Sequence, residues 1–161
     1  MALISCCNVL FPDENLTIKR KDYTGNELRT DGYYYYFNES TNVTVIYFFY
    51  RNGVILLVDS YFGTDLGTIE KEIVNAKFNP KSNWGVFIID NNYIQYERWV
   101  GSLSSAPKAF ISKSTGYILN DTTLHFTQRY DSEQKETRII NEVWHFKQFF
   151  PKPDSTNVYI K

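Results

Sequence analysis

Short runs of aromatic and β-branched residues, each ended by turn-forming residues, follow one another along the chain between residues 32 and 146. Such runs are typical of β-strands, because flat and β-branched side chains pack well on a pleated surface. The 161 residues include 13 tyrosines and 12 phenylalanines, so aromatic side chains can supply much of a core. The pattern predicts one antiparallel β-rich domain with tight turns.

A first hairpin is expected around Asn52-Gly53, the strongest short hairpin signal in the chain, because both turn positions tolerate positive φ. With a two-residue turn there, Tyr50 is expected opposite Ile55, and the flanking residues follow in the same register. Both faces of this hairpin are apolar. One face should therefore meet the core, and the other face needs a cover.

Residues 65–77 supply that cover, since apolar residues recur there at helical spacing, namely Leu66, Ile69, Ile73 and Ala76. Asp65 can cap the first turn through its carboxylate. Asn79-Pro80 is expected to end the helix, because proline biases the preceding residue away from the α conformation. The apolar stripe should pack on the sheet or across a barrel mouth.

A second hairpin is expected around Asn91-Asn92, with one face carrying the cleaner apolar run, made of Phe87, Ile89, Ile94, Tyr96 and Arg98. We take this face as the core face. Arg98 then points inward opposite Gly85, which leaves it room. A guanidinium on a core face is costly unless it is paired or binds an anion. Arg98 is thus either an anchor for an acidic ligand or a structural cation stacked on an aromatic ring such as that of Tyr34 or Tyr36.

Eight or nine short strands joined mostly by tight turns indicate a meander, and a meander removes its exposed edges most completely by closing into a barrel. The expected fold is mainly β: an antiparallel up-and-down barrel of about eight strands with one short helix. We expect this single barrel domain to span residues 28–161. Residues 1–27 are polar and charged beyond the first few positions, and are expected to form a tether.

The segment Leu3-Ile4-Ser5-Cys6 resembles the lipobox of bacterial lipoproteins. The resemblance implies that Cys6 is lipidated after cleavage and anchors the protein in the bacterial cell envelope. Only five residues precede Cys6, whereas a secretion signal needs an apolar region of about 7–15 residues. The alternative is that Met1-Ala2-Leu3 is an ordinary cytosolic start.

Few signs of catalysis or nucleic-acid binding are present. The net charge is −1 and the 17 basic residues are spread along the chain, so a basic nucleic-acid footprint is missing. The sequence holds no glycine-rich phosphate loop or nucleophile elbow, and the only cysteines, Cys6 and Cys7, are adjacent. We expect a protein that is not an enzyme and needs no cofactor.

Three polar side chains are candidate exceptions. His125 and His145 could hold a metal if their strands pair, but two imidazoles without a third ligand make a poor site, so no metal is expected. The alternative places His125 on a solvated side together with Thr123, Thr127 and Arg129. Glu97 points away from Arg98 by strand alternation and is expected to be a surface carboxylate paired across strands.

The order of strands from Asp31 to Phe146 resembles small lipocalin-like lipoproteins of Gram-negative bacteria. The segments that carry the resemblance are Asp31–Tyr35, Tyr50–Gly53, Trp84–Ile89, Glu97–Trp99 and Gly116–Thr123. In lipocalins a Gly-x-Trp lies on the first strand, where this chain has Gly32-Tyr33-Tyr34, and the helix usually follows the barrel rather than the third strand. The resemblance implies an up-and-down barrel that can hold a ligand.

Two functions follow from these expectations. The first is a lipid-anchored barrel that binds a small hydrophobic or amphiphilic molecule, with the binding residues Arg98, Tyr96, Phe87, Tyr34 and Tyr36. The second is a structural or protein-interaction lipoprotein with a filled core. The interior volume separates them, because an open cavity of several hundred cubic ångströms, within the roughly 300–1,000 Å³ range of ligand sites, favours binding.

Overall fold

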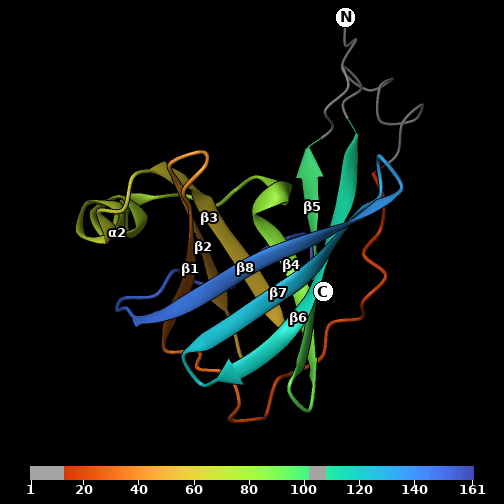
Figure 1. The fold of residues 1–161 in the computed structure, drawn as a ribbon, viewed down its shortest axis with the longest axis horizontal. Helices are drawn as coiled ribbons and strands as arrows, with labels where there is room; N and C mark the ends of the chain where they lie inside the picture. Colours follow the sequence, from red (N-terminus) through yellow and green to blue (C-terminus); the bar gives the residue numbers. More distant parts are fainter. Residues whose placement is uncertain (1–12, 102–107) are drawn as a thin grey trace, which may run out of the picture.

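The computed structural model describes residues 13–101 and 108–161, apart from the side chains of residues 59 and 60. They form a closed barrel of eight antiparallel strands in sequence order (Figure 1). The elements are β1 (Gly32–Asn38), β2 (Val43–Phe49), β3 (Val54–Phe62), α2 (Leu66–Asn75), the 3₁₀ turn η1 (Lys81–Asn83), β4 (Trp84–Asp90), β5 (Tyr93–Gly101), β6 (Ala109–Asn120), β7 (Thr123–Asp131) and β8 (Glu136–Gln148). Cys6 lies outside the described residues.

The predicted up-and-down barrel is confirmed. Each strand pairs with the next one along the chain, and β1 closes the barrel against β8, with Gly32 opposite Gln148 and Tyr35 opposite His145. The shortest strand pairing is that between β3 and β4, which pair only from Val54 to Leu56.

The predicted register of the first hairpin is wrong by one residue. Phe49, not Tyr50, lies opposite Ile55. The turn contains three residues, because the N–H of Tyr50 donates to the carbonyl of Val54 and Gly53 adopts a φ of 77°. Glycine suits this left-handed position, and a three-residue turn of this kind is a common alternative to the two-residue hairpin loop.

Helix α2 covers the outer face of that hairpin, as the apolar stripe predicted. Ile69 and Ile73 are buried in a cluster with outward-facing residues of β2 and β3 such as Phe48 and Leu56. Asp65 caps the helix by accepting hydrogen bonds from the backbone N–H groups of Gly67 (3.1 Å) and Thr68 (3.3 Å). The helix ends at Asn75, before Asn79-Pro80, because Ala76 is already extended.

The second hairpin has the predicted register. Phe87 lies opposite Tyr96 and Gly85 opposite Arg98, across a two-residue turn at Asn91-Asn92. Gly85 is required there, because a Cβ at this position would lie 2.7 Å from the Cβ of Arg98 and 2.2 Å from the carbonyl oxygen of Glu97. Arg98 can therefore occupy the inner face only because its cross-strand neighbour has no side chain.

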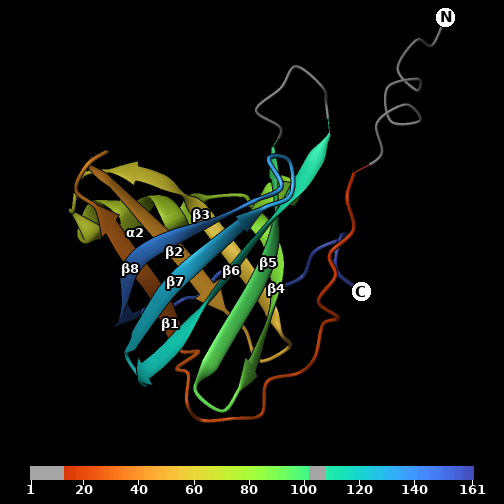
Figure 2. The ribbon, with the colours of Figure 1, turned by 45° about the vertical axis from the view of Figure 1, so that its right-hand side comes forward.

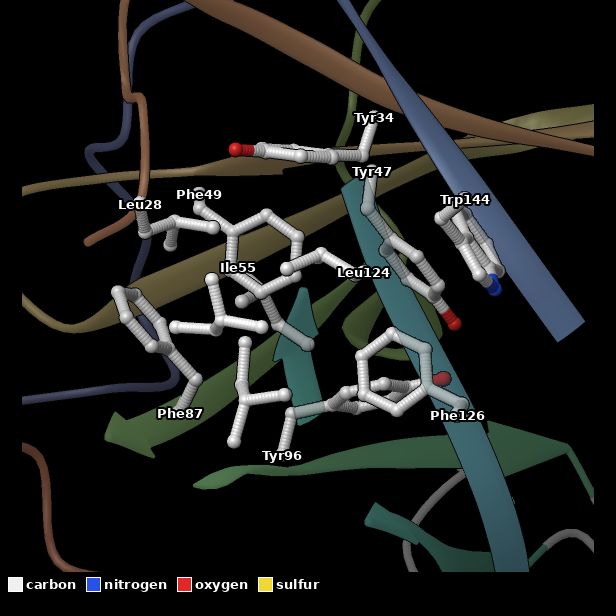
Figure 3. Packing of buried hydrophobic residues seen from close by; sticks show 12 residues of the cluster. Leu28, Tyr34, Tyr47, Phe49, Ile55, Phe87, Tyr96, Leu124, Phe126 and Trp144 are labelled. Atoms are coloured by element: carbon white, nitrogen blue, oxygen red, sulfur yellow. The ribbon is translucent and has the colours of Figure 1, made fainter. Parts of the chain in front are cut away.

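Aromatic rings fill most of the barrel interior (Figure 3). Phe49 packs edge-on against Phe87, with ring centroids 5.1 Å apart, and Tyr96 packs in the same way against Phe126 at 5.1 Å. Edge-to-face pairs at such distances stabilise a core beyond the burial of their area. The interior is therefore largely solid.

The N-terminal segment closes one end of the barrel. It passes beside β5 and turns under the barrel before entering β1 (Figure 2). Tyr23 packs on Phe87 with ring centroids 5.9 Å apart, and its hydroxyl accepts the N–H of the buried Leu28 at 2.7 Å. The described part of the expected tether is thus attached to the barrel, while the division of the chain at residues 27 and 28 stays a prediction.

The C-terminal tail completes this closed end through Lys152. Its ammonium donates to the carbonyls of Thr30 (2.6 Å) and Phe49 (2.9 Å) and lies 4.0 Å from the ring centroid of Tyr50. Burial lowers the pKa of Lys152 to about 8, since desolvation disfavours the charged ammonium. The tail thereby ties together the start of β1 and the end of β2.

We expect truncation of Phe87 to alanine to cost about 3–5 kcal/mol in the free energy of unfolding, through lost transfer energy and the cavity left behind. Gln95 lies on the opposite face of the same hairpin, and its change to alanine should cost less than about 0.5 kcal/mol. Urea denaturation of both variants measures the difference. A larger loss for Gln95→Ala would contradict the observed facing of the hairpin.

Candidate functional site: two cavities of the barrel

The barrel has a small cavity, which we call the mouth pocket, at the end opposite the one that the N-terminal segment closes. Its volume is about 160 Å³, and its walls come from β1, β2, β3, β5, β7 and β8. The side chains that matter for recognition are those of Tyr36, Tyr47, Arg98, Arg129, Glu142 and Trp144. Two cations and one carboxylate thus face a space bounded by aromatic rings.

Arg129 and Glu142 form an ion pair inside the pocket. Nη2 of Arg129 lies 2.8 Å from Oε2 of Glu142, and Nε of Arg129 donates to the hydroxyl of Ser114 at 3.2 Å. Burial by itself would lower the pKa of Arg129, but nearby Tyr96, Glu142 and Tyr47 raise the pKa above its ordinary value. Arg129 therefore keeps its charge, which its ion pair with Glu142 balances inside the pocket.

Arg98 supplies the remaining positive charge. Within residues 13–101 and 108–161, its hydrogen bonds run through Nη1 to the carbonyls of Ser82 (3.4 Å) and Trp99 (3.2 Å), and it forms no ion pair. Tyr47 lies beside it, and burial raises the pKa of the Tyr47 hydroxyl, so this hydroxyl stays protonated at neutral pH. The pocket is therefore an aromatic cavity with a net charge of about +1, because one of its two cations is neutralised by Glu142.

The pocket brings together part of the predicted binding set. Arg98 and Tyr36 line it, and Tyr96 lies one layer deeper, where its hydroxyl bonds to that of Tyr47. Tyr34 and Phe87 do not reach the pocket. They lie in the filled part of the barrel, and the Tyr34 hydroxyl donates to the carbonyl of Asp121 at 2.8 Å.

Sequence reasoning missed the Arg129–Glu142 pair. Arg129 was expected on the solvated side, with His125 and Thr127, but the pairing of β7 with β8 shifts by one residue between Phe126 and Gln128. The extra residue of this bulge turns Arg129 inward. Alternation cannot reveal a bulge, and the only available signal was an arginine and a glutamate on neighbouring strands.

Glu97 is buried rather than exposed, so that part of its prediction is wrong. Its carboxylate accepts hydrogen bonds from the N–H of Thr17 (2.6 Å), the hydroxyl of Thr17 (2.5 Å) and the N–H of Ile18 (2.9 Å). The predicted cross-strand partner exists, since Nζ of Lys113 lies 3.8 Å away. The N-terminal segment covers Glu97, and two of the segment's backbone N–H groups, those of Thr17 and Ile18, donate to this one carboxylate.

A larger cavity, the outer groove, lies beside this attachment. Its volume is about 770 Å³, and it separates the N-terminal segment from the outward faces of β5 to β8. Glu14 forms part of the segment's wall, where its carbonyl accepts Nε1 of Trp99 at 2.7 Å and its carboxylate accepts the hydroxyl of Ser132. Lys113, Thr115 and Tyr130 are among the residues of the opposite wall.

The two histidines do not meet. His125 lies opposite Val143 and bonds to Asn141 at 2.8 Å, whereas His145 lies opposite Thr123 and beside the ring of Tyr35. No group of three or more His, Cys, Asp or Glu side chains in the described part of the chain could hold a metal ion. Among the same residues, no helix has the length and apolar character needed to cross a membrane.

Comparison of the chain with protein-family models, with curated proteins and with solved structures finds no match in any of the three.

Replacing Glu97 by alanine should release the N-terminal segment, because three hydrogen bonds to one buried carboxylate are lost together. Hydrogen bonds to charged groups contribute about 1.5–3 kcal/mol each, so the amides of Thr17 and Ile18 should exchange at least about tenfold faster. Amide hydrogen exchange followed by NMR measures this. Lys113→Ala is the control, since it removes only the 3.8 Å ion pair, and an equal effect of both variants would contradict the attachment described.

Proposed function

We propose that the protein is a lipid-anchored binding module of the bacterial cell envelope whose barrel holds a small anionic ligand in the mouth pocket. The observation that carries the proposal is Arg98: a guanidinium without an ion-pair partner in the described residues faces an aromatic interior cavity. A planar carboxylate satisfies such a guanidinium best, because it can accept two parallel hydrogen bonds from the fork.

The size of the pocket limits the ligand. At about 160 Å³ it lies below the 300–1,000 Å³ typical of ligand sites, but it is close to the roughly 150 Å³ of an engineered cavity that binds benzene. The aromatic rings below it leave no channel for a long acyl chain. The ligand we propose is therefore a single-ring or short aliphatic monocarboxylate, and long fatty acids are excluded.

The charge of the pocket points the same way. Glu142 neutralises Arg129, so a ligand with one negative charge balances Arg98, whereas a dianion leaves one charge unpaired in a partly buried site. An unpaired charge away from water is costly. Tyr36, Tyr47 and Trp144 offer ring faces and edges to the apolar part of the ligand.

A second candidate function is an interaction protein that uses its outer surface. The filled interior favours it, because an amphiphile-binding barrel needs a cavity of several hundred cubic ångströms, within the 300–1,000 Å³ range. The outer groove has that size, about 770 Å³, but lies outside the barrel. Both candidates share the lipid anchor at Cys6, which rests on Leu3-Ile4-Ser5-Cys6.

Titration with benzoate and its methyl ester tests the binding proposal. Benzoate should bind the wild type more tightly than methyl benzoate, and Arg98→Met should weaken benzoate binding about 10- to 100-fold, as expected for charge-assisted hydrogen bonds of about 1.5–3 kcal/mol. Isothermal calorimetry or ligand-observed NMR gives the affinities. Arg138→Met, which removes an exposed arginine of β8, is the matched control and should bind like the wild type. Equal binding of acid and ester, or none, would leave the interaction protein as the better interpretation.

Lipidation at Cys6 is tested separately. When the gene is expressed with its upstream sequence in a Gram-negative host, the membrane fraction should contain a protein that begins at Cys6 and carries diacylglycerol and an acyl chain. Intact-mass spectrometry measures this mass, and Cys6→Ser should abolish it and release the protein from the membrane. An unmodified wild-type protein in the cytosol would contradict lipidation at Cys6.

A further inference from the structure

Strands β5 to β8 lie side by side in the barrel wall (Figure 2), and we call their outward side, which the N-terminal segment covers at Glu97, the outer face. The pairing of these strands sets its side chains in registered rows. The row nearest the closed end of the barrel holds Tyr93, Tyr117, His125 and Val143, each opposite the next across the strands. Tyr93 is 38% and Tyr117 44% exposed, and their rings pack edge-on with centroids 5.7 Å apart. Two aromatic rings are thus presented together to solvent.

A third exposed ring lies further along the same face. Tyr130 is 37% exposed, stands opposite Lys113 and lines the outer groove. Lys113 precedes Tyr117 on β6 by four residues, which is about 13 Å along a strand. The exposed tyrosines are therefore spaced along a line, with Val143 (37% exposed) and Ile139 (80% exposed) of β8 beside them, and a ligand that touches all three rings must be elongated.

Neutral hydrogen-bonding groups occupy the row between these rings. Gln95, Thr115 and Gln128 lie opposite one another across β5, β6 and β7, and the row ends on β8 with the apolar Ile139 opposite Gln128. Each amide presents a donor and an acceptor in one plane, and each hydroxyl can do either. Such groups match vicinal hydroxyls, which also donate and accept side by side.

The charges bordering the face cancel. Glu97 pairs with Lys113 at 3.8 Å, and Glu14 pairs with Lys108 at 3.5 Å, so the outer groove presents paired rather than free charge. A neutral ligand complements this surface, whereas a polyanion or polycation meets one repulsive partner in each pair.

From these observations we infer that the outer face binds a neutral oligosaccharide. Pyranose rings offer apolar C–H faces that stack on tyrosine and equatorial hydroxyls that bond to amides, and a chain of them is elongated. A protein partner cannot bind here by strand addition, because the closed barrel has no free edge. The inference does not depend on the mouth pocket, which lies inside the barrel.

The test uses the full chain and four neutral hexasaccharides: cellohexaose, maltohexaose, xylohexaose and chitohexaose. Isothermal calorimetry should detect binding of at least one, with an affinity unchanged by saturating benzoate. Tyr117→Ala and Tyr130→Ala should each weaken that binding about fivefold, in the range of a single aromatic contact. Phe62→Ala removes a ring that is 85% exposed on β3 and is the matched control that should bind as the wild type does. Circular dichroism confirms that the variants fold.

Three results would overturn the inference. One is that none of the four sugars binds, and another is that Phe62→Ala weakens binding as much as the two tyrosine variants do. The third is tighter binding of hexagalacturonate than of every neutral sugar, since the paired charges favour a neutral ligand. Self-association at high concentration that broadens the Tyr117 and Tyr130 ring signals, without any sugar binding, would identify the face as a protein interface instead.

Discussion

The interior of an eight-stranded barrel is only wide enough to be filled by its own side chains or to hold one small ligand, and the rest of this structure depends on how that narrow space is used. Here rings take most of it. Phe49 of β2 meets Phe87 of β4 edge to face, and Tyr96 of β5 meets Phe126 of β7 in the same way. These contacts join strands through the centre that are not paired by backbone hydrogen bonds. With the centre solid, binding chemistry is confined to the mouth and the outer surface.

The buried cations at the two ends of the barrel have different kinds of partner. At the closed end, Lys152 is satisfied by backbone carbonyls and a tyrosine ring, and burial lowers its pKa to about 8. At the mouth, Arg129 is satisfied by a carboxylate and keeps its charge. A buried lysine can lose its proton, whereas an arginine cannot. Positive charge is therefore permanent at the mouth, which is where an anion would bind.

The sequence predicts which residues pair and which face inward only where the turn has the expected length and the alternation of the strand is not interrupted by a bulge. The hairpin at Asn91-Asn92 follows the simplest two-residue turn, so its pairing and the inward direction of Arg98 were predictable. The hairpin at Asn52-Gly53 uses a three-residue turn, and β7 contains a bulge, so the counts that placed Tyr50 and Arg129 fail by one residue each. The burial of Glu97 depends on contacts with Thr17 and Ile18, about 80 residues away, which periodicity cannot detect.

Glu97 and Arg98 show why the facing of β5 matters to both cavities. Alternation puts these neighbours on opposite faces, so the carboxylate holds the N-terminal segment outside while the guanidinium reaches the mouth pocket inside. A slip of one residue would exchange them, placing an unpaired carboxylate among aromatic rings and an arginine against the amides of Thr17 and Ile18. Both placements are costly, because a buried charge without a partner loses its hydration. The pairing of Gly85 with Arg98 prevents that slip, since only at that position does the strand leave space beside the arginine. The register of this one hairpin thus determines which side chain of β5 lines the mouth pocket and which lines the outer groove.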